Sequence, residues 1–304
     1  MTSTTIRRAS MSPPLLVTNP TNIRYLTGVK LTEGVVIAPG HVGARHGSTR
    51  LTTGAVPLLF VDGRYTEKAR TEAKRGVRIL PLADLEKHLK KCKRVRFEAG
   101  YVTVARLGRL RKKFRGVKFV ASEGVIEDLR RRKTTEEIRA ITKACRITDK
   151  VLATIPRLLQ TEPNKARHAE QAPDGASTHP STSSGRLSMT SQRRVEAGIT
   201  EKQLSWEIEQ RSHDLGADAM AFEIIVAFGE NTSRPHHRPT NRKLRRGDIV
   251  QIDMGVKVNG YCSDCSRVFF TAPPTVEQRK TYNLLLAIVR EATRMTKASA
   301  KSTA

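Results

Sequence analysis

Two aspartates late in the sequence, Asp253 and Asp264, have a residue type and a spacing suited to metal chemistry. They flank Asn259-Gly260, the dipeptide that most strongly predicts a two-residue β-hairpin turn. With this turn Asp253 pairs with Ser266. Because side chains alternate between the two faces of a strand, Asp253 and Asp264 then share one face. As diagonal neighbours, their backbones would lie about 7–8 Å apart.

The charge of these two carboxylates suggests what they could bind. Two carboxylates in otherwise apolar strands are costly to bury alone, and a pair of divalent cations would remove that cost. Dinuclear hydrolases hold their metals about 3.5–4 Å apart, and Gly255 is expected to leave open space beside the pair. Geometry alone leaves an alternative open, in which one aspartate caps a turn and the other is solvated.

The elements before this hairpin fall into two groups. The first part of the chain alternates strand and helix patterns, which predicts an α/β domain with a mixed sheet. The pattern changes near residue 130, so we expect domains at 14–130 and 131–292. The expected strands of the first domain are 15–17, 35–38, 57–61, 77–80, 95–97 and 118–120.

Two capping boxes predict helix starts in the second domain. Thr134-x-x-Glu137 opens a long helix, and Thr200-x-x-Gln203 opens a shorter one. Residues 160–194 are rich in small and polar residues, which predicts a disordered insertion. Flexible tails are expected at 1–13 and 296–304. The apolar stripe expected on the long helix is Ile138, Ile141, Cys145, Leu152 and Ile155.

Composition limits the classes of protein that the chain could be. The net charge is +26, and residues 87–118 are especially basic, yet aromatic residues are only 5% and no nucleic-acid module is visible. No specific nucleic-acid partner is therefore expected. No apolar run is long enough to span a membrane and no secretory signal is seen, so we expect a cytoplasmic protein without a membrane partner. The four cysteines are expected to be reduced, buried thiols.

Three motifs identify a family resemblance. Pro235-His236, then G-D-x-V-x-x-D-x-G at 247–255, then G-Y-x-S-D at 260–264 follow in fixed order. Together they resemble the creatinase-type metallopeptidases of pita-bread fold, which include Xaa-Pro aminopeptidases, prolidases, methionine aminopeptidases and creatinase. Segments 22–28, 60–65 and 133–138 resemble the N-terminal domain of the Xaa-Pro aminopeptidase branch.

The resemblance implies a fold, a reaction and a set of roles. The implied fold is α/β (α+β), with a creatinase-like mixed-sheet domain followed by a partial pita-bread domain. The implied reaction is metal-dependent release of an N-terminal residue that precedes proline. Asp253 would be a bidentate ligand of one metal, Asp264 would bridge two metals, and His236 would contact substrate or shuttle a proton. The implied cofactors are two divalent ions, with Mn first and Co or Zn as alternatives.

The sequence also departs from the family pattern. The family adds one histidine and two glutamates after the second aspartate, but the last histidine here is His237, and only Glu277 and Glu291 follow Asp264. The expectation is therefore a C-terminally truncated peptidase, inactive alone and without stably bound metals. Its expected partners are a peptide with proline at the second position, and a second copy or a complementing C-terminal fragment. The alternative is a non-catalytic creatinase-fold module that binds peptides or an acidic or nucleic-acid partner.

Overall fold

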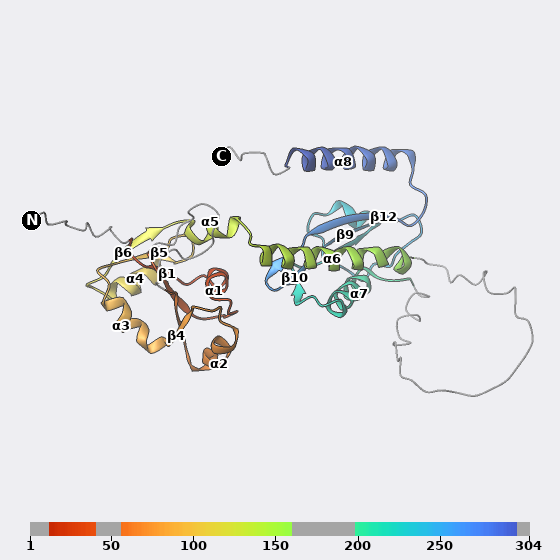
Figure 1. The fold of residues 1–304 in the computed structure, drawn as a ribbon. Coiled ribbons are helices and arrows are strands. Elements are labelled where there is room, and N and C mark those ends of the chain that lie inside the picture. Colours follow the sequence, from red (N-terminus) through yellow and green to blue (C-terminus); the bar gives the residue numbers. More distant parts are fainter. Residues whose placement is uncertain (1–11, 41–55, 160–197, 297–304) are drawn as a thin grey trace, which may run out of the picture. The chain divides into compact units, whose positions relative to one another are not determined.

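The computed structural model describes residues 12–40, 56–159 and 198–296 (Figure 1). The chain divides into two compact units, Met1–Thr134 and Thr135–Ala304. The insertion expected at 160–194 lies outside the described residues, as do nearly all of the expected tails. Within the described ranges, no helix is long and apolar enough to cross a membrane.

A six-stranded mixed sheet organises the first unit, as the sequence predicts. The strand order is β4-β3-β2-β1-β5-β6. Strand β2 pairs antiparallel with both β1 and β3, whereas the other neighbours are parallel. The strands are β1 (Leu15–Val17), β2 (Val35–Ala38), β3 (Leu58–Val61), β4 (Arg78–Pro81), β5 (Arg94–Glu98) and β6 (Lys118–Ser122).

Helices cover both faces of this sheet. Successive residues of β1 face opposite sides, so Leu15 and Val17 join one core cluster and Leu16 joins the other. The first cluster contains residues of α1 (Pro20–Thr27), α2 (Gly63–Glu72) and α5 (Val125–Arg131). The second contains residues of α3 (Leu85–Lys90) and α4 (Val104–Lys113).

The second unit packs helices α6 (Thr135–Leu158) and α7 (Glu201–Asp214) against two three-stranded sheets. The sheet orders are β11-β10-β7 and β12-β9-β8. The shared core includes the fully buried side chains of Leu204, Phe228 and Ile252. The strands are β7 (Ala219–Met220), β8 (Ile225–Phe228), β9 (Ile249–Met254), β10 (Val256–Val258), β11 (Tyr261–Cys262) and β12 (Cys265–Phe270).

The predicted apolar stripe of α6 is wrong in its first half. Ile138 is 53% exposed and Cys145 is also exposed, whereas Ala140 and Ala144 are buried. Hydrophobicity favours the larger side chains, but small alanines let the helix lie close to β10 and β11. The expected burial of the cysteines is also wrong for two of them. All four thiols are free, and Cys145 and Cys262 are exposed.

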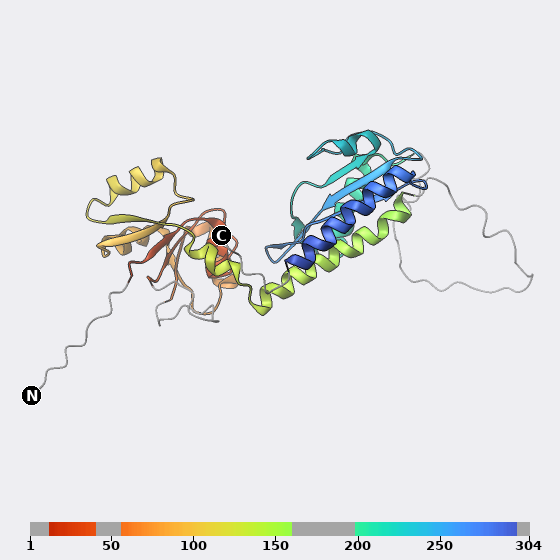
Figure 2. The same ribbon diagram turned by 90° about the horizontal axis from the view of Figure 1, so that it is seen from above.

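The last helix, α8 (Val276–Met295), has no buried residue. In Figure 1, β9 and β12 lie between it and α6, and in Figure 2 its axis runs nearly parallel to that of α6. Its Tyr282 ring meets Phe270 of β12 edge to face, with ring centroids 6.0 Å apart. Large apolar side chains on the same helix, including Leu284 and Leu285, are more than half exposed.

We predict that α8 adds little to the stability of the second unit. Ile252→Ala should lower the free energy of unfolding by about 2–5 kcal/mol, because it empties a fully buried position. Leu285→Ala, the matched control, should change it by less than about 0.5 kcal/mol, because its side chain is exposed. Urea unfolding followed by the fluorescence of Trp206, the single tryptophan, reports on this unit. Equal losses would contradict the prediction.

Candidate functional site

The hairpin predicted around Asn259-Gly260 is present with the predicted register. Asp253 pairs with Ser266 across β9 and β12, and Val258 pairs with Tyr261 across β10 and β11. Asn259 and Gly260 both have positive φ, 50° and 85°, as a type I′ turn requires. The local turn chemistry therefore determines the pairing that carries the two aspartates.

Gly255 does not leave open space, contrary to the sequence-based expectation. A Cβ at this position would lie 2.0 Å from the Ser263 carbonyl oxygen and 2.9 Å from the Phe222 ring. The glycine instead lets the two strands approach closely. The buried Ser263 hydroxyl accepts from the Val256 N–H at 2.9 Å and lies 2.7 Å from the Thr148 hydroxyl of α6. This close approach fixes the hairpin beside the aspartates to the long helix.

One pocket brings together the three residues predicted to be functional. It has a volume of about 360 Å³, and Asp253, Asp264 and His236 all line it. Asp253 is half-buried, and its Oδ1 accepts a hydrogen bond from the Ser266 hydroxyl at 2.9 Å. Asp264 is exposed. The other lining residues are Phe222, Glu223, Ile225, His237 and Arg238.

The two adjacent histidines have different environments. His236 is exposed and has a φ of 55°, a left-handed conformation that is uncommon for a residue with a side chain. His237 is buried, and its Nε2 lies 2.9 Å from Oε2 of Glu201. Because His237 is held by this contact, His236 is the histidine that remains available to a molecule in the pocket.

Glu201 anchors the loop that carries the histidines, a role that no sequence pattern predicts. Its carboxylate is fully buried, and it accepts from the Phe228 N–H at 2.8 Å and the Asn231 side-chain amide at 2.8 Å. It also accepts from the N–H and hydroxyl of Thr240, at 2.9 and 2.6 Å. The carboxylate thus fixes both ends of the loop that carries the histidines. The available signal was its place at the first position of a capped helix, where an anion is favoured.

These contacts determine the acidity of Glu201. Burial raises the pKa of its carboxyl group, but hydrogen bonds from Thr240, Asn231, His237 and the Phe228 N–H outweigh burial. The result is a pKa lowered from 4.5 to about 2. The carboxylate therefore stays ionised at neutral pH, as a buried anion can when enough donors surround it.

A second ion-pair network supports the same loop. Arg242 is largely buried, and it bonds Glu230 at 2.6 Å and Asp248 at 2.7 Å. Asp248 also accepts from the Arg245 N–H at 2.8 Å. The aspartate of the G-D pair at 247–248 is thus occupied by structural contacts, and it does not line the pocket.

The described residues offer too few ligands to enclose a metal pair. Carboxylate oxygens suit Mn²⁺ and similar ions, so the chemistry of Asp253 and Asp264 fits. Within the described parts of the chain, however, no group of three or more His, Cys, Asp or Glu side chains is arranged to hold a metal ion. Glu277 and Glu291 do not line the pocket, and Glu291 pairs with Arg294 at 2.7 Å.

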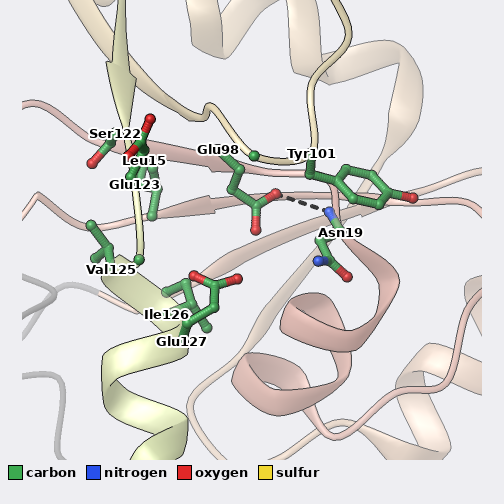
Figure 3. Close-up of a pocket in the computed structure, with 11 residues that line it drawn as sticks. Leu15, Asn19, Glu98, Tyr101, Ser122, Glu123, Val125, Ile126 and Glu127 are labelled. Carbon is green, nitrogen blue, oxygen red and sulfur yellow. Dashed lines mark hydrogen bonds between the residues drawn. The ribbon is translucent and has the colours of Figure 1, made fainter. Parts of the chain in front are cut away.

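A second cavity, in the first unit, is also acidic (Figure 3). It measures about 300 Å³ and lies where β5 and β6 end, with Glu98 and Glu127 among its lining residues. Glu98 accepts from the Thr18 and Asn19 N–H groups at 2.6 and 2.9 Å. The Asn22 amide donates to both glutamates, at 2.7 and 2.6 Å. These carboxylates therefore tie α1, β5 and α5 together, which is a structural role.

We predict that Glu201 contributes a pH-dependent stability. Because its pKa in the folded protein lies below 4.5, its contribution is complete above about pH 4.5 and is lost as the pH falls toward 2. Glu201→Gln should cost about 3 kcal/mol at pH 7, and this cost should shrink between pH 5 and pH 3. Urea unfolding of the unchanged chain and of Glu201→Gln at several pH values measures this cost.

The matched control for this prediction is Glu207→Gln in the same helix. Glu207 forms an i,i+4 ion pair with Arg211 and is partly exposed, so its removal should cost less than about 1 kcal/mol. A cost at Glu201 that is the same at pH 7 and pH 3 would show that the carboxylate charge is not what stabilises the loop.

Comparison with known proteins agrees with this arrangement of elements. Residues 13–132 match the Creatinase/Prolidase N-terminal domain, and residues 139–303 match metallopeptidase family M24. The chain is 25% identical to the Xaa-Pro dipeptidase of Pyrococcus furiosus over 279 residues, which cover 91% of this chain and 66% of that protein.

Solved structures show the same fold. An X-Pro aminopeptidase from Thermotoga maritima superposes with a TM-score of 0.70 at 22% identity, covering 94% of this chain and 70% of that one. An Xaa-Pro dipeptidase from Bacillus anthracis superposes with a TM-score of 0.67 at 24% identity, covering 90% and 64%. The chain spans about two thirds of the length of such relatives. With its creatinase-like first unit and pita-bread second unit, the chain belongs to metallopeptidase family M24.

Proposed function

We propose that this chain carries part of the site of an Xaa-Pro peptidase, an enzyme that releases the N-terminal residue before a proline. The observation that supports this proposal is the pocket lined by Asp253, Asp264 and His236. In it Asp253 and Asp264 are the metal ligands, and His236 contacts the peptide. The named relatives include Xaa-Pro dipeptidases and an X-Pro aminopeptidase.

The arrangement of the pocket is consistent with these roles. The Ser266 hydroxyl holds one oxygen of Asp253, a residue that lines the pocket, and so restrains the orientation of this carboxylate. The ring of His236 is exposed and can move toward a bound peptide. The ring of the neighbouring His237 is held by Glu201. Divalent ions, with Mn as our first choice and Co or Zn as alternatives, supply such hydrolases with a polarised carbonyl group and an acidified water.

We further propose that the chain alone is inactive and holds metal weakly. Two carboxylates do not define a cage for two ions, since metal affinity depends on the number and geometry of the ligands. A complementing fragment or a second copy would have to supply further donors.

A cytoplasmic location stays a prediction.

A metal-free peptide-binding module is the second candidate function. The observation that favours it is the small number of metal donors in the described residues, together with a pocket large enough for part of a peptide. The two candidates differ in whether Mn²⁺ binds through the aspartates.

The purified chain can be titrated with Mn²⁺ and followed by the electron paramagnetic resonance signal of the free ion. We predict weak binding that Asp264→Ala reduces by at least about 10-fold, because it removes half of the carboxylate ligands. Asp214→Ala removes an exposed aspartate from the end of α7 and should have no effect.

Hydrolysis of Ala-Pro-Phe in the presence of Mn²⁺ completes the test. We expect no release of alanine above the buffer rate by the chain alone. Hydrolysis that Asp264→Ala abolishes would show that the chain's own residues complete the site. Peptide binding without any Mn²⁺ binding would overturn the peptidase proposal and support the binding module.

A further inference from the structure

The first unit contains a strongly basic region that the peptidase proposal does not explain. Across residues 87–118 the only acidic residue is Glu98. That residue is 8% exposed, and its carboxylate bonds Thr18, Asn19 and Asn22 at the carboxyl end of β5. No acidic side chain within this segment is therefore left to neutralise its exposed lysines and arginines.

The fold gathers many of these cations at one edge of the sheet, the edge formed by the amino ends of β5 and β6. Strands β5 and β6 are parallel and adjacent, with Arg94 paired to Lys118 at their amino ends. The Lys118 N–H donates to the Lys93 carbonyl at 3.0 Å. Helices α3 and α4 end just before these strands, so their last turns lie at the same edge. We call the basic edge the exposed residues Lys91, Lys93, Arg94, Lys112, Arg115 and Lys118.

A local salt bridge draws the two helices together here. Glu86 of α3 contacts Lys90 at 2.8 Å and Lys113 at 2.9 Å. These two lysines hold the pKa of Glu86 down to about 2. Glu86 is thus already paired with two cations that are not counted in the basic edge.

Helix termini explain only part of this charge. Basic residues are favoured in the last turn of a helix, where they complement the helix dipole. Lys93, Arg115 and Lys118 lie beyond those turns, in connecting segments or at a strand start. Among the described residues, none of the six in the basic edge forms an ion pair with an acidic side chain. A concentration of uncompensated cations favours a polyanionic partner.

We propose that the basic edge binds the phosphate backbone of a nucleic acid. The contacts would be independent of sequence, because no aromatic side chain is exposed there to stack on bases. Phe97 and Phe114 are both 5% exposed. An anionic membrane fits less well, because no large apolar side chain is exposed in described residues 87–94 or 111–118 to enter a bilayer.

The test uses the full chain and a fluorescein-labelled 20-base-pair DNA duplex of mixed sequence, with binding measured by anisotropy from 50 to 200 mM NaCl. Changing Lys91, Lys93, Arg115 and Lys118 together to Gln should weaken binding at 100 mM NaCl at least about 10-fold. The slope of log K against log salt should become shallower by about 3–4, since each lost phosphate contact removes about 0.9. With a labelled 20-nucleotide single-stranded RNA, the same substitutions should make the slope shallower by about 3, because each lost contact removes about 0.7.

The matched control removes the same charge from the second unit. Arg246, Arg279, Lys280 and Arg290 are exposed, and changing all four to Gln lowers the net charge equally. This variant should keep its affinity within about 3-fold. Equal losses in the two variants would show that only net charge matters and would overturn the proposal.

Two further measurements complete the design. Circular dichroism melting of both variants should match the unchanged chain, because all eight side chains are exposed; if the basic-edge variant melts early, the single change Lys118→Gln is used in its place, with a slope change of about 0.9. Vesicles of phosphatidylserine and phosphatidylcholine serve as the competing polyanion. Vesicle binding that depends on the basic edge, without duplex or RNA binding, would contradict the proposal.

Discussion

The candidate site depends on the hydrogen bonds that the buried carboxylate of Glu201 accepts. This carboxylate accepts hydrogen bonds from Phe228 at the end of β8, from Asn231, and from Thr240 beyond the histidines. An ionised group at zero exposure is stable only because donors on all sides replace its water. If the loop left α7, the Glu201 carboxylate would lose these donors. The hydrogen bonds therefore keep the loop in place and His236 in the lining of the pocket.

The first unit uses the same device at Glu98. There a buried glutamate accepts from the backbone at the start of α1, and Asn22 joins it to Glu127 of α5. In both units an acid from one element satisfies the backbone N–H groups of another. Such contacts bring directionality that apolar packing lacks, so they fix the position of a loop or helix end and not merely its burial.

The second unit holds its candidate site residues on a rigid scaffold, and the described residues contain no group of three or more metal-binding side chains. The strands, the Ser266 hydrogen bond and the glutamate-anchored loop hold three residues around one pocket. This unit also exposes several large apolar side chains on α8, and proteins usually bury apolar surface of this kind. The proposed peptidase role therefore depends on what completes the site, whereas the proposed nucleic-acid contact depends only on the first unit.

Short-range chemistry was predictable from the sequence by itself. Asn259-Gly260 requires two positive φ angles, and this turn determines the register that places Asp253 opposite Ser266. The motifs at 235–236, 247–255 and 260–264 were enough to indicate the family, and the mixed sheet of the first unit followed from its alternating pattern. The turn and the motifs each depend on residues close together in the chain, and so does the alternation of strand and helix from which the mixed sheet was expected.

The tertiary structure alone decided the features that depend on distant residues. The bonds of Glu201 join positions up to 39 residues away, and no periodicity marks them. The buried face of α6 follows from how close β10 and β11 lie, so it uses Ala140 and Ala144 where hydrophobicity favoured Ile138. Gly255 is needed because the Ser263 backbone approaches it, a contact that forms only once the strands pair. Local propensity determines turns and registers, but close approach and the partners of a buried charge are determined only when the chain packs.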